Sequence, residues 1–426
     1  MEKINVLIFP GGTEIGLEIW RSLKDCKDIR LYSAASDVSN HAPYVFARHF
    51  IVPHVDEKNW LESLNQIIIE QEIDYVFPAH DDAIVALAEN ADKIKARIVS
   101  SPPWTCQITR SKSQTYKILS DIVPVPFVYE NSDMIDHYPV FVKPDLGEGS
   151  QDIHVAYNRE QVRQLLSNGK VYVVTEFLPG EEFTVDCFSH REQGLLFCGG
   201  RERIRIRNGI SMNSRPVDEK LFRDYAYAIS AKLAFHGAWF FQLKRDRKGM
   251  LKLLEVAPRI AGTMALHRVQ GINFALLSRY EQENIFLRIL ANDVDMEIDR
   301  ALVNRYSHKL KYSVVYLDLD DTLILNNCVN INLVQFLYQC INGRIRIVLL
   351  TKYSGDLKQA LREHRLSELF DEIVKMERTA CKADYIREPD AILIDDSFSE
   401  RKAVNDKLGI LTFDCSMIEM LINERA

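Results

Sequence analysis

The sequence lacks several features that would assign it to a specialised class of protein. No run approaches the roughly 20 apolar residues that a membrane-spanning helix needs, and the opening MEKINVLIFPGG does not have the form of a signal peptide. The net charge of −7 disfavours a general nucleic-acid or anionic-membrane surface, so neither is expected as a partner. The eight cysteines show no zinc-ribbon spacing. We therefore expect reduced core thiols in a cytoplasmic protein.

The length and the apolar pattern predict a multidomain protein. A chain of 426 residues exceeds what one hydrophobic core organises. Residues 1–105 and 312–426 alternate short apolar runs with amphipathic stretches, which is typical of α/β domains with a parallel sheet. Residues 106–303 mix β-rich runs with helices, an α+β pattern, and the polar stretch 304–311 is predicted to be a linker. Predicted helices include 13–24, 82–94, 222–233 and 274–291.

Two strand ends of the first domain have more than one interpretation. The segment PGGTEIG at 10–16 follows a predicted strand and opens a helix, where glycines let backbone N–H groups approach a phosphate. Its spacing is not that of the dinucleotide fingerprint, so tight strand-to-helix packing is the better interpretation. Asp81 and Asp82 follow another strand. They could line a cleft, but we favour helix capping or a domain contact.

The middle domain contains five local signals in order, and the first three concern a nucleotide. The segment 111–117 places lysines at a helix start. A strand that ends in Lys143 runs into the glycine-bearing loop 147–150. Such a lysine can lie beside phosphates while the loop folds over them. The segment 173–186 joins two strands through a turn at Pro179-Gly180, so that free backbone groups can contact an adenine edge and a carboxylate can hold ribose hydroxyls.

The last two signals add charge to the same predicted site. Arginines alternate along one strand, at Arg201, Arg203, Arg205 and Arg207. At period two they are expected to share one face, which is either solvated or turned to the phosphates. Gln242 and Glu255 lie near facing ends of two apparently paired strands, and their oxygens suit Mg²⁺ bridging ATP phosphates. Arg259 can hold an oxyanion through two hydrogen bonds.

In this order the five signals resemble the ATP-grasp superfamily, over roughly residues 1–300. The resemblance implies a Rossmann-like pre-ATP-grasp domain before an ATP-grasp fold, as in carbamoyl phosphate synthetase and biotin carboxylase. It implies ATP, Mg²⁺ or Mn²⁺, a small-molecule carboxylate that becomes an acyl phosphate, and an amine or thiol that displaces the phosphate.

The resemblance also assigns roles to individual residues. Lys143 contacts phosphate, and Lys112 or Lys117 is a second candidate for that role. Glu182 holds the ribose. The residues implied for ATP are Lys112, Lys143, Ser150, Glu176, Phe177, Leu178 and Glu182; Gln242 and Glu255 are implied as metal ligands and Arg259 as the arginine near the acyl phosphate. Ala257 departs from the pattern, because the family usually has Asn there and alanine cannot coordinate a metal. The second Mg²⁺ site is therefore expected to be weak or completed by another ligand.

The C-terminal domain has polar groups after three apolar strands. Asp318 and Asp320 follow the first strand, Thr351 ends the second, Lys382 comes later, and Asp395-Asp396 follow the third. Carboxyl ends of parallel strands meet at one sheet edge, where α/β folds bind ligands. A single acidic strand end could be a helix cap, but two acidic clusters with Thr and Lys make that interpretation weak.

This segment resembles the haloacid dehalogenase-like (HAD-like) hydrolase superfamily, over about 312–426, and implies a Rossmannoid phosphatase domain acting on a phosphorylated substrate. By resemblance Asp318 is the nucleophile that forms an aspartyl phosphate and Asp320 is the acid/base. Thr351 and Lys382 bind the phosphoryl group. Asp318, Asp320 and Asp396 form the Mg²⁺ site, with Asp395 nearby. Thr351 comes 33 residues after Asp318, which is too few for a large cap domain.

The favoured interpretation is a bifunctional enzyme, in which an ATP-dependent carboxylate–amine (or thiol) ligase is joined to a phosphatase. A carbamoyl-phosphate-synthetase-like phosphorylating enzyme is disfavoured, because one ATP-grasp unit is present and no amidotransferase segment is seen. A nucleotide-binding regulatory or scaffold protein is the alternative of a different class, with Ala257 marking lost ligase chemistry. The sequence leaves the substrates and the oligomeric state open.

Overall fold

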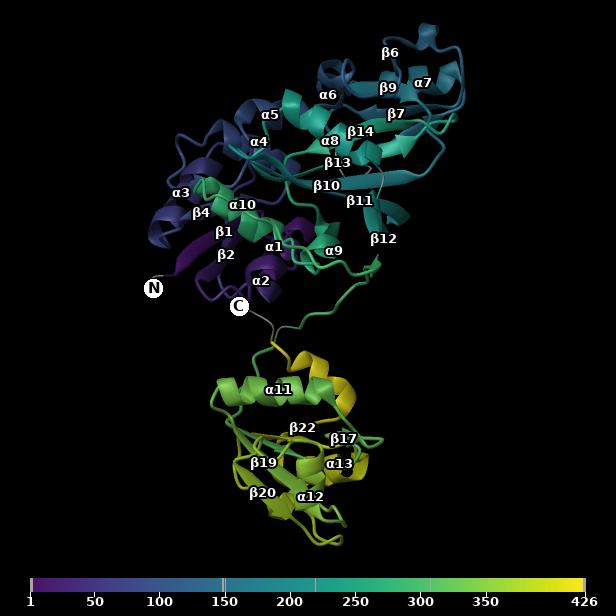
Figure 1. The fold of residues 1–426 in the computed structure, drawn as a ribbon. Helices are drawn as coiled ribbons and strands as arrows, with labels where there is room; N and C mark the ends of the chain where they lie inside the picture. The colour runs from purple at the N-terminus through teal and green to yellow at the C-terminus, as the bar shows by residue number, and fades with distance from the viewer. Residues whose placement is uncertain (1–2, 148, 150, 219, 307, 424–426) are drawn as a thin grey trace. The chain divides into compact units, whose positions relative to one another are not determined.

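The computed structural model describes residues 3–147, 149, 151–218, 220–306 and 308–423. Ser150, one of the residues implied for ATP, lies outside them. Contacts divide the chain into two units, residues 1–303 and 304–425, which are described separately (Figure 1). In the described residues no helix is both long and apolar enough to cross a membrane.

The first unit begins with a parallel α/β domain. Its sheet has the order β3-β2-β1-β4-β5. The strands are β1 (Ile4–Phe9), β2 (Ile29–Ala35), β3 (His49–Ile51), β4 (Tyr75–Pro78) and β5 (Arg97–Ile98); the helices are α1 (Glu14–Leu23), α2 (Ala42–Val45), α3 (Trp60–Glu70) and α4 (Asp81–Glu89). Ile19 of α1 shares a core with Val6 on one face of the sheet, and Leu64 of α3 shares a core with Leu7 on the other. Both faces are therefore covered by helices, as expected for a doubly wound sheet.

The glycines between β1 and α1 lie in close packing. A Cβ on Gly11 would lie 2.4 Å from Cβ of Ser33 on β2, and a Cβ on Gly16 would lie 2.8 Å from the backbone oxygen of Gly11. No real Cβ contact is this short, so the turn requires glycine for steric reasons. This agrees with the packing interpretation of the segment.

Two antiparallel sheets follow in the same unit. The smaller has the order β6-β9-β7-β8 and the larger the order β14-β13-β10-β11-β12-β15. The first contains β6 (Val128–Tyr129), β7 (Val140–Pro144), β8 (His154–Ala156) and β9 (Tyr172–Glu176); the second contains β10 (Glu182–His190), β11 (Gly194–Arg207), β12 (Ile210–Val217), β13 (Gly237–Arg245), β14 (Leu251–Ala257) and β15 (Ile298–Asp299). In Figure 1 the strands of the smaller sheet lie above those of the larger.

Helices cover both sheets. They are α5 (Pro103–Arg110), α6 (Lys112–Leu119), α7 (Arg159–Leu166), α8 (Lys220–Lys232), α9 (Ala265–Arg268) and α10 (Phe274–Gln282), with 3-10 turns η1 (Ser132–Met134) and η2 (Gly262–Met264). Phe222 of α8 shares a core with Phe183 and Phe241 on one face of the large sheet. Phe240 and Ala257 belong instead to the core that contains α1 and β1. The large sheet thus packs against the N-terminal domain through its other face.

Two predicted helices are too long. The one predicted at 274–291 ends at Gln282, and Asn284 has a φ of 55°. Asparagine tolerates this left-handed conformation, which a continuing α-helix does not contain. The helix predicted at 82–94 ends at Glu89, with Asn90 as its C-cap.

The second unit contains a parallel sheet with the order β20-β19-β16-β21-β22. Its strands are β16 (Val314–Leu317), β19 (Arg346–Thr351), β20 (Glu372–Lys375), β21 (Ala391–Ile394) and β22 (Leu411–Phe413), with the hairpin β17 (Ile324–Leu325) and β18 (Cys328–Val329); the helices are α11 (Ile331–Asn342), α12 (Leu357–Glu363) and α13 (Phe398–Leu408), with η3 (Lys382–Asp384) and η4 (Cys415–Met420). Between β16 and β19 the chain forms this hairpin and α11, which leaves no room there for a large cap domain.

Candidate active sites

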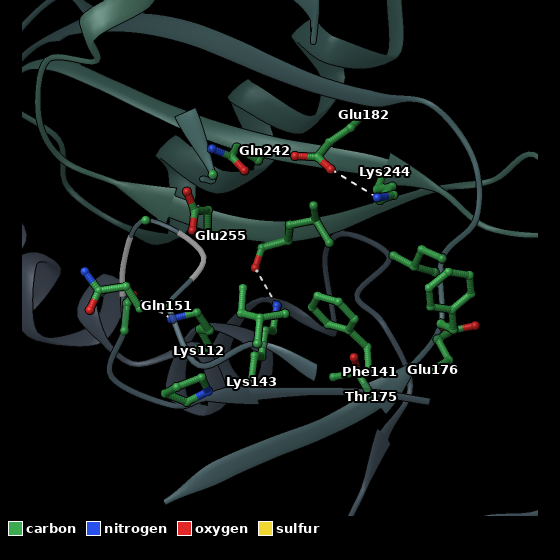
Figure 2. A pocket seen from close by; sticks show the side chains of 18 of the residues that line it. Lys112, Phe141, Lys143, Gln151, Thr175, Glu176, Glu182, Gln242, Lys244 and Glu255 are labelled. Carbon is green, nitrogen blue, oxygen red and sulfur yellow. Dashed lines mark hydrogen bonds and ion pairs between the residues drawn. The ribbon is translucent and has the colours of Figure 1, made fainter. Parts of the chain in front are cut away.

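A pocket between the two antiparallel sheets collects the residues predicted for ATP and its metal (Figure 2). Eight of the predicted residues line it: Lys112, Lys143, Glu176, Phe177, Leu178, Glu182, Gln242 and Glu255. Gly147 and Gly149 of the glycine-bearing loop line it as well, and so does Gln151, which follows the loop. Side chains that are up to 143 positions apart in the sequence, from residue 112 to residue 255, therefore meet in one cavity.

Lys143 lies at the end of β7 and is almost fully buried. Its Nζ donates to the Tyr116 hydroxyl at 2.6 Å and approaches the backbone oxygen of Leu254 at 3.5 Å. Burial lowers the pKa of Lys143 to about 8, although the Glu255 and Glu182 carboxylates partly oppose this effect. Both hydrogen-bond partners of the Lys143 ammonium are uncharged, so they do not neutralise its positive charge. An anionic phosphate in the pocket would therefore interact strongly with it.

The structure distinguishes the two candidate lysines of α6. Lys112 lines the pocket and donates to the backbone oxygen of Gly147 at 2.9 Å. Burial lowers its pKa. Lys117 is exposed and does not line the pocket. The helix start is fixed by Ser111, whose side chain caps α6 and donates to Asp145 at 2.8 Å.

The segment after β9 forms another wall. Glu176 Oε1 accepts from the backbone N–H of Phe127 at 2.9 Å, so its side chain has a structural contact. Phe177 and Leu178 come after the last paired residue of β9, outside the sheet ladder. Glu182 opens β10 and accepts from Lys244 at 3.1 Å and from Arg203.

Gln242 and Glu255 are directly opposite each other on β13 and β14. Both line the pocket, and Gln242 Oε1 accepts from Arg203 at 3.1 Å. An amide oxygen and a carboxylate on facing strands form a donor set that fits Mg²⁺. The bulge that follows Gln242 shifts the strand register, which no sequence pattern indicated.

Arg259 lies beside a second, smaller cavity and not in the first. That cavity is also lined by Lys112, Gly147 and Glu255, which it shares with the first pocket. Arg259 forms a two-point ion pair with Asp81 of the N-terminal domain, at 2.5 Å and 3.1 Å. This agrees with the domain contact favoured for the Asp81-Asp82 pair. The helix cap suggested for that pair is wrong, because His80 caps α4, and Asp81 also lines the second cavity. Burial alone would raise the pKa of Asp81, but the Arg259 guanidinium outweighs it and lowers the pKa to about 2.

The arginine run does not share one face, so that expectation is wrong. Arg201 pairs with buried Asp186, and Arg203 reaches the pocket at Glu182. The register with β12 then shifts between Arg203 and Arg205, and Arg205 pairs with exposed Asp299 instead. A β-bulge reverses the alternation of side chains along a strand, which the period-two argument could not anticipate.

The sequence did not predict every residue that shapes the pocket. Lys244 lines it without having been predicted, and Tyr116, which lies in the segment 111–117, contacts Lys143 without lining the pocket. Lys244 lies two residues after Gln242 on β13, so period two was an available signal for it. Tyr116 and Gln151 carried no signal beyond their proximity to the predicted lysines.

The second unit brings acidic strand ends together. Asp318, Asp395 and Asp396 each offer an oxygen within 4.8 Å of the others. They follow β16 and β21, which are adjacent in the sheet. Thr351 is buried at the end of the neighbouring β19. Asp320 is not part of this three-carboxylate group, although it was predicted as a metal ligand.

Lys382 connects the two acidic clusters. Its buried Nζ lies 2.9 Å from Asp318 Oδ1 and pairs with Asp395. Burial would lower the pKa of Lys382, but the two carboxylates raise it. Burial raises the pKa of Asp318 and of Asp320, and the neighbouring Asp321 and Asp396 carboxylates add to the effect at Asp320. Asp396 is exposed, and its Oδ1 accepts from Thr322 at 3.1 Å.

A doubly wound N-terminal domain, two antiparallel sheets and a pocket between those sheets define the first unit as a member of the ATP-grasp class. Residues 6–100 match the family model described as "PylC-like, N-terminal domain", and residues 169–285 match "ATP-grasp in the biosynthetic pathway with Ter operon". These matches place the first unit in the ATP-grasp superfamily, with a PylC-like pre-ATP-grasp domain.

A curated relative is similar to about half of the chain. A carbamoyl-phosphate synthase from Methanobrevibacter smithii is 23% identical over 242 residues, which cover 51% of this chain and 64% of that protein. The chain thus spans less than two thirds of that relative's length.

Solved structures share the fold at low sequence identity. The biotin carboxylase domain of 2-oxoglutarate carboxylase from Hydrogenobacter thermophilus, in complex with MgADP and bicarbonate, has a TM-score of 0.58 at 13% identity, covering 68% of this chain and 72% of that one. L-amino acid ligase from Bacillus licheniformis has a TM-score of 0.53 at 18% identity, covering 67% and 74%. N5-carboxyaminoimidazole synthetase from Staphylococcus aureus has a TM-score of 0.52 at 16% identity, covering 66% and 80%.

Proposed function

We propose that residues 1–303 form an ATP- and Mg²⁺-dependent ligase that activates a carboxylate as an acyl phosphate and transfers the acyl group to an amine or thiol. The observation that carries this proposal is the pocket itself. Buried Lys143 and half-buried Lys112 meet there with a strand-to-strand segment free of the sheet ladder and two facing oxygen donors, in the order that the motifs require. A related fold bound to MgADP supports the same assignment.

Each lining group has a distinct proposed task. Lys112 and Lys143 bind phosphates, the backbone of Phe177 and Leu178 contacts adenine, and Glu182 holds the ribose. Gln242 and Glu255 would hold Mg²⁺, which neutralises charge on the phosphates. A substrate carboxylate oxygen attacks the γ-phosphorus and ADP leaves. Arg259 holds the oxyanion, and the nucleophile then displaces phosphate.

The test is ADP and phosphate release from ATP with Mg²⁺, across a panel of amino acids, bicarbonate and other small carboxylates. We expect ADP formation that requires a carboxylate, survives Asp318→Asn and disappears in Glu255→Ala. Glu202→Gln is a matched control, because Glu202 pairs with Arg215 outside the pocket. ADP release that persists in Glu255→Ala would place the chemistry elsewhere. Tight ATP binding without any turnover would favour the regulatory alternative, in which Ala257 marks lost ligase chemistry.

We infer a second activity for residues 304–425, a Mg²⁺-dependent phosphatase of the HAD-like type. The specific observation is that Lys382 contacts Asp318 and Asp395 while Asp396 completes a group of three oxygen donors. In this proposal Asp318 attacks the phosphorus, and Asp320 protonates the leaving oxygen. Water then hydrolyses the aspartyl phosphate. A hairpin in place of a large cap leaves room for a bulky phosphorylated substrate.

Hydrolysis of p-nitrophenyl phosphate by the full chain tests this second activity. We expect phosphate release that needs Mg²⁺, stops with a chelator and is insensitive to Glu255→Ala. Phosphate release that Glu255→Ala abolishes would assign the activity to the first unit instead.

A further inference from the structure

Two carboxylates in the first turn of α4, those of Asp81 and Asp82, form ion pairs with arginines of the ATP-grasp part. Asp81 Oδ1 and Oδ2 accept from Arg259 Nε and Nη2 at 2.5 Å and 3.1 Å. Asp82 Oδ1 accepts from Arg110 Nε and Nη2 at 2.9 Å and 2.6 Å. The side chain of Asp81 is 19% exposed and that of Asp82 is 40% exposed. The Asp81 pair is therefore the better shielded of the two, where an ion pair has more effect on geometry.

Arg259 is held on three sides. Besides the two bonds to Asp81, its Nη1 donates to the backbone oxygen of Ile260 at 3.2 Å, and its guanidinium lies over the Phe240 ring at 5.0 Å from the centroid. A guanidinium has five N–H donors, so these three bonds leave two, one on Nη1 and one on Nη2. Both remaining donors are on the terminal nitrogens, because Asp81 occupies the Nε side.

The orientation of the Arg259 guanidinium decides which groups of the proposed active site it can contact. The cavity that it lines is shared with Lys112 and Glu255, and both of these also line the ATP pocket. Glu255 is the competitor for the guanidinium among the proposed functional carboxylates, since it lines the same cavity and its charge acts on Arg259. An Arg259–Glu255 ion pair would occupy the proposed metal ligand and turn the arginine away from an incoming oxyanion.

We propose that Asp81 is a positioning residue for the ligase reaction: it fixes Arg259 so that the two remaining N–H donors face the phosphoryl group transferred from ATP, and it keeps the guanidinium off Glu255. This inference rests on the proposed function of residues 1–303. It makes the PylC-like domain part of the active site, because Asp81 comes from α4 of that domain.

The test compares the affinities of the full chain for MgADP and for MgADP with aluminium fluoride, a mimic of the transferred phosphoryl group, by calorimetry. In the wild type we expect aluminium fluoride to tighten binding. Asp81→Asn is expected to keep the MgADP affinity and to lose roughly 10–100-fold of the additional affinity, the size of a charge-assisted pair. Arg259→Lys should lose a similar factor. The double variant should lose no more than either single variant, because Asp81 acts through Arg259.

Glu18→Gln is the matched control. Glu18 of α1 is buried and accepts from Arg268 at 2.7 Å, so it also joins the N-terminal domain to the ATP-grasp part, but it lines neither cavity. It should lower the melting temperature and leave both affinities unchanged. Asp81→Glu, which keeps the charge, should recover part of the loss.

Four results would overturn the inference. If Asp81→Asn bound MgADP and MgADP with aluminium fluoride as tightly as the wild type does, Asp81 would not be a positioning residue. An equal loss in Glu18→Gln would reduce the role to domain packing. A wild type that binds MgADP without tightening by aluminium fluoride would show that Arg259 does not face the phosphoryl group, while ATP binding stands. A wild type that binds no MgADP contradicts the proposed function itself, and the inference falls with it.

Discussion

The two candidate sites have opposite charge balances. The pocket of the first unit contains four cationic side chains, Lys112, Lys143, Arg203 and Lys244, and three carboxylates, Glu176, Glu182 and Glu255. At the strand ends of the second unit, Asp318, Asp320, Asp395 and Asp396 lie with Lys382. A cation-rich cavity gains most from a polyanion, and an acid-rich edge gains most from a metal ion. For the two proposed functions, this difference predicts that a nucleotide organises the first site and a metal ion the second.

The sites also differ in how the chain builds them. The pocket is assembled from two sheets and α6, so its geometry depends on long-range packing and on register shifts in the pairing of β11 with β12 and of β13 with β14. The second site uses the ends of three adjacent parallel strands, β19, β16 and β21. Parallel strands bring their carboxyl ends to one edge automatically, so simple topology suffices there.

The largest expected effect is the loss of the proposed phosphatase activity in Asp318→Asn. An amide of the same shape cannot act as the nucleophile, and we expect hydrolysis of p-nitrophenyl phosphate to fall by at least about a thousandfold, in the range seen when a covalent nucleophile is removed. ATP binding should be unchanged. Retained hydrolysis would show that Asp318 is not the nucleophile and would weaken the contrast between the two sites.

The next largest effect is stabilisation by Mg²⁺ alone, which we expect for the second unit but not for the first. Mg²⁺ without nucleotide should raise the melting temperature of the second unit, and saturation at a hundred times the dissociation constant would add about 2.7 kcal/mol to its stability. Asp396→Asn should remove most of this stabilisation while it keeps the oxygen that accepts from Thr322. Differential scanning calorimetry on the full chain measures both. If Mg²⁺ alone stabilised the first unit equally, the proposed difference between the two sites would be wrong.

A smaller, roughly tenfold effect is expected from pH at the nucleotide site. The pKa of Lys143 is lowered to about 8, mainly by burial, so the side chain is charged below that pH and loses its proton above it. Binding of an anionic phosphate requires the charged form. ATP affinity should therefore be nearly constant below about pH 7 and fall roughly tenfold between pH 7 and pH 9, as a single titration with this pKa dictates.

Lys143→Met provides the control for that measurement. It should bind ATP more weakly at neutral pH and show a flatter profile between pH 7 and pH 9. A profile as steep as that of the wild type would assign the titration to another group, such as Lys112, whose pKa burial also lowers.

The sequence predicted much of the fold because hydrophobic period and motif order are local properties. Strands β1 and β4 end just before residue 10 and shortly before Asp81, where the sequence placed strand ends, and eight residues predicted for ATP or its metal line the pocket. What it could not predict depends on contacts between distant residues. The partner of Arg259 is Asp81, 178 positions away, and the separation of Arg203 from Arg205 follows from a bulge in pairing with β12. A helix end set by Asn284 in the left-handed region is likewise a tertiary result.

The smallest expected effect on activity comes from Gly11→Ala, and it distinguishes packing from phosphate binding at the start of α1. Its Cβ would lie 2.4 Å from Cβ of Ser33, a contact that neither backbone can relieve without moving a strand. We expect a loss of about 1–3 kcal/mol in stability, typical of overpacking, with ATP and MgADP affinities unchanged. Gly343→Ala is the control, since its nearest neighbour would be a backbone oxygen at 3.3 Å. If Gly11→Ala melted like the wild type but bound a dinucleotide less tightly than the wild type, the glycines would serve a ligand, and the N-terminal domain would contain a third site of its own.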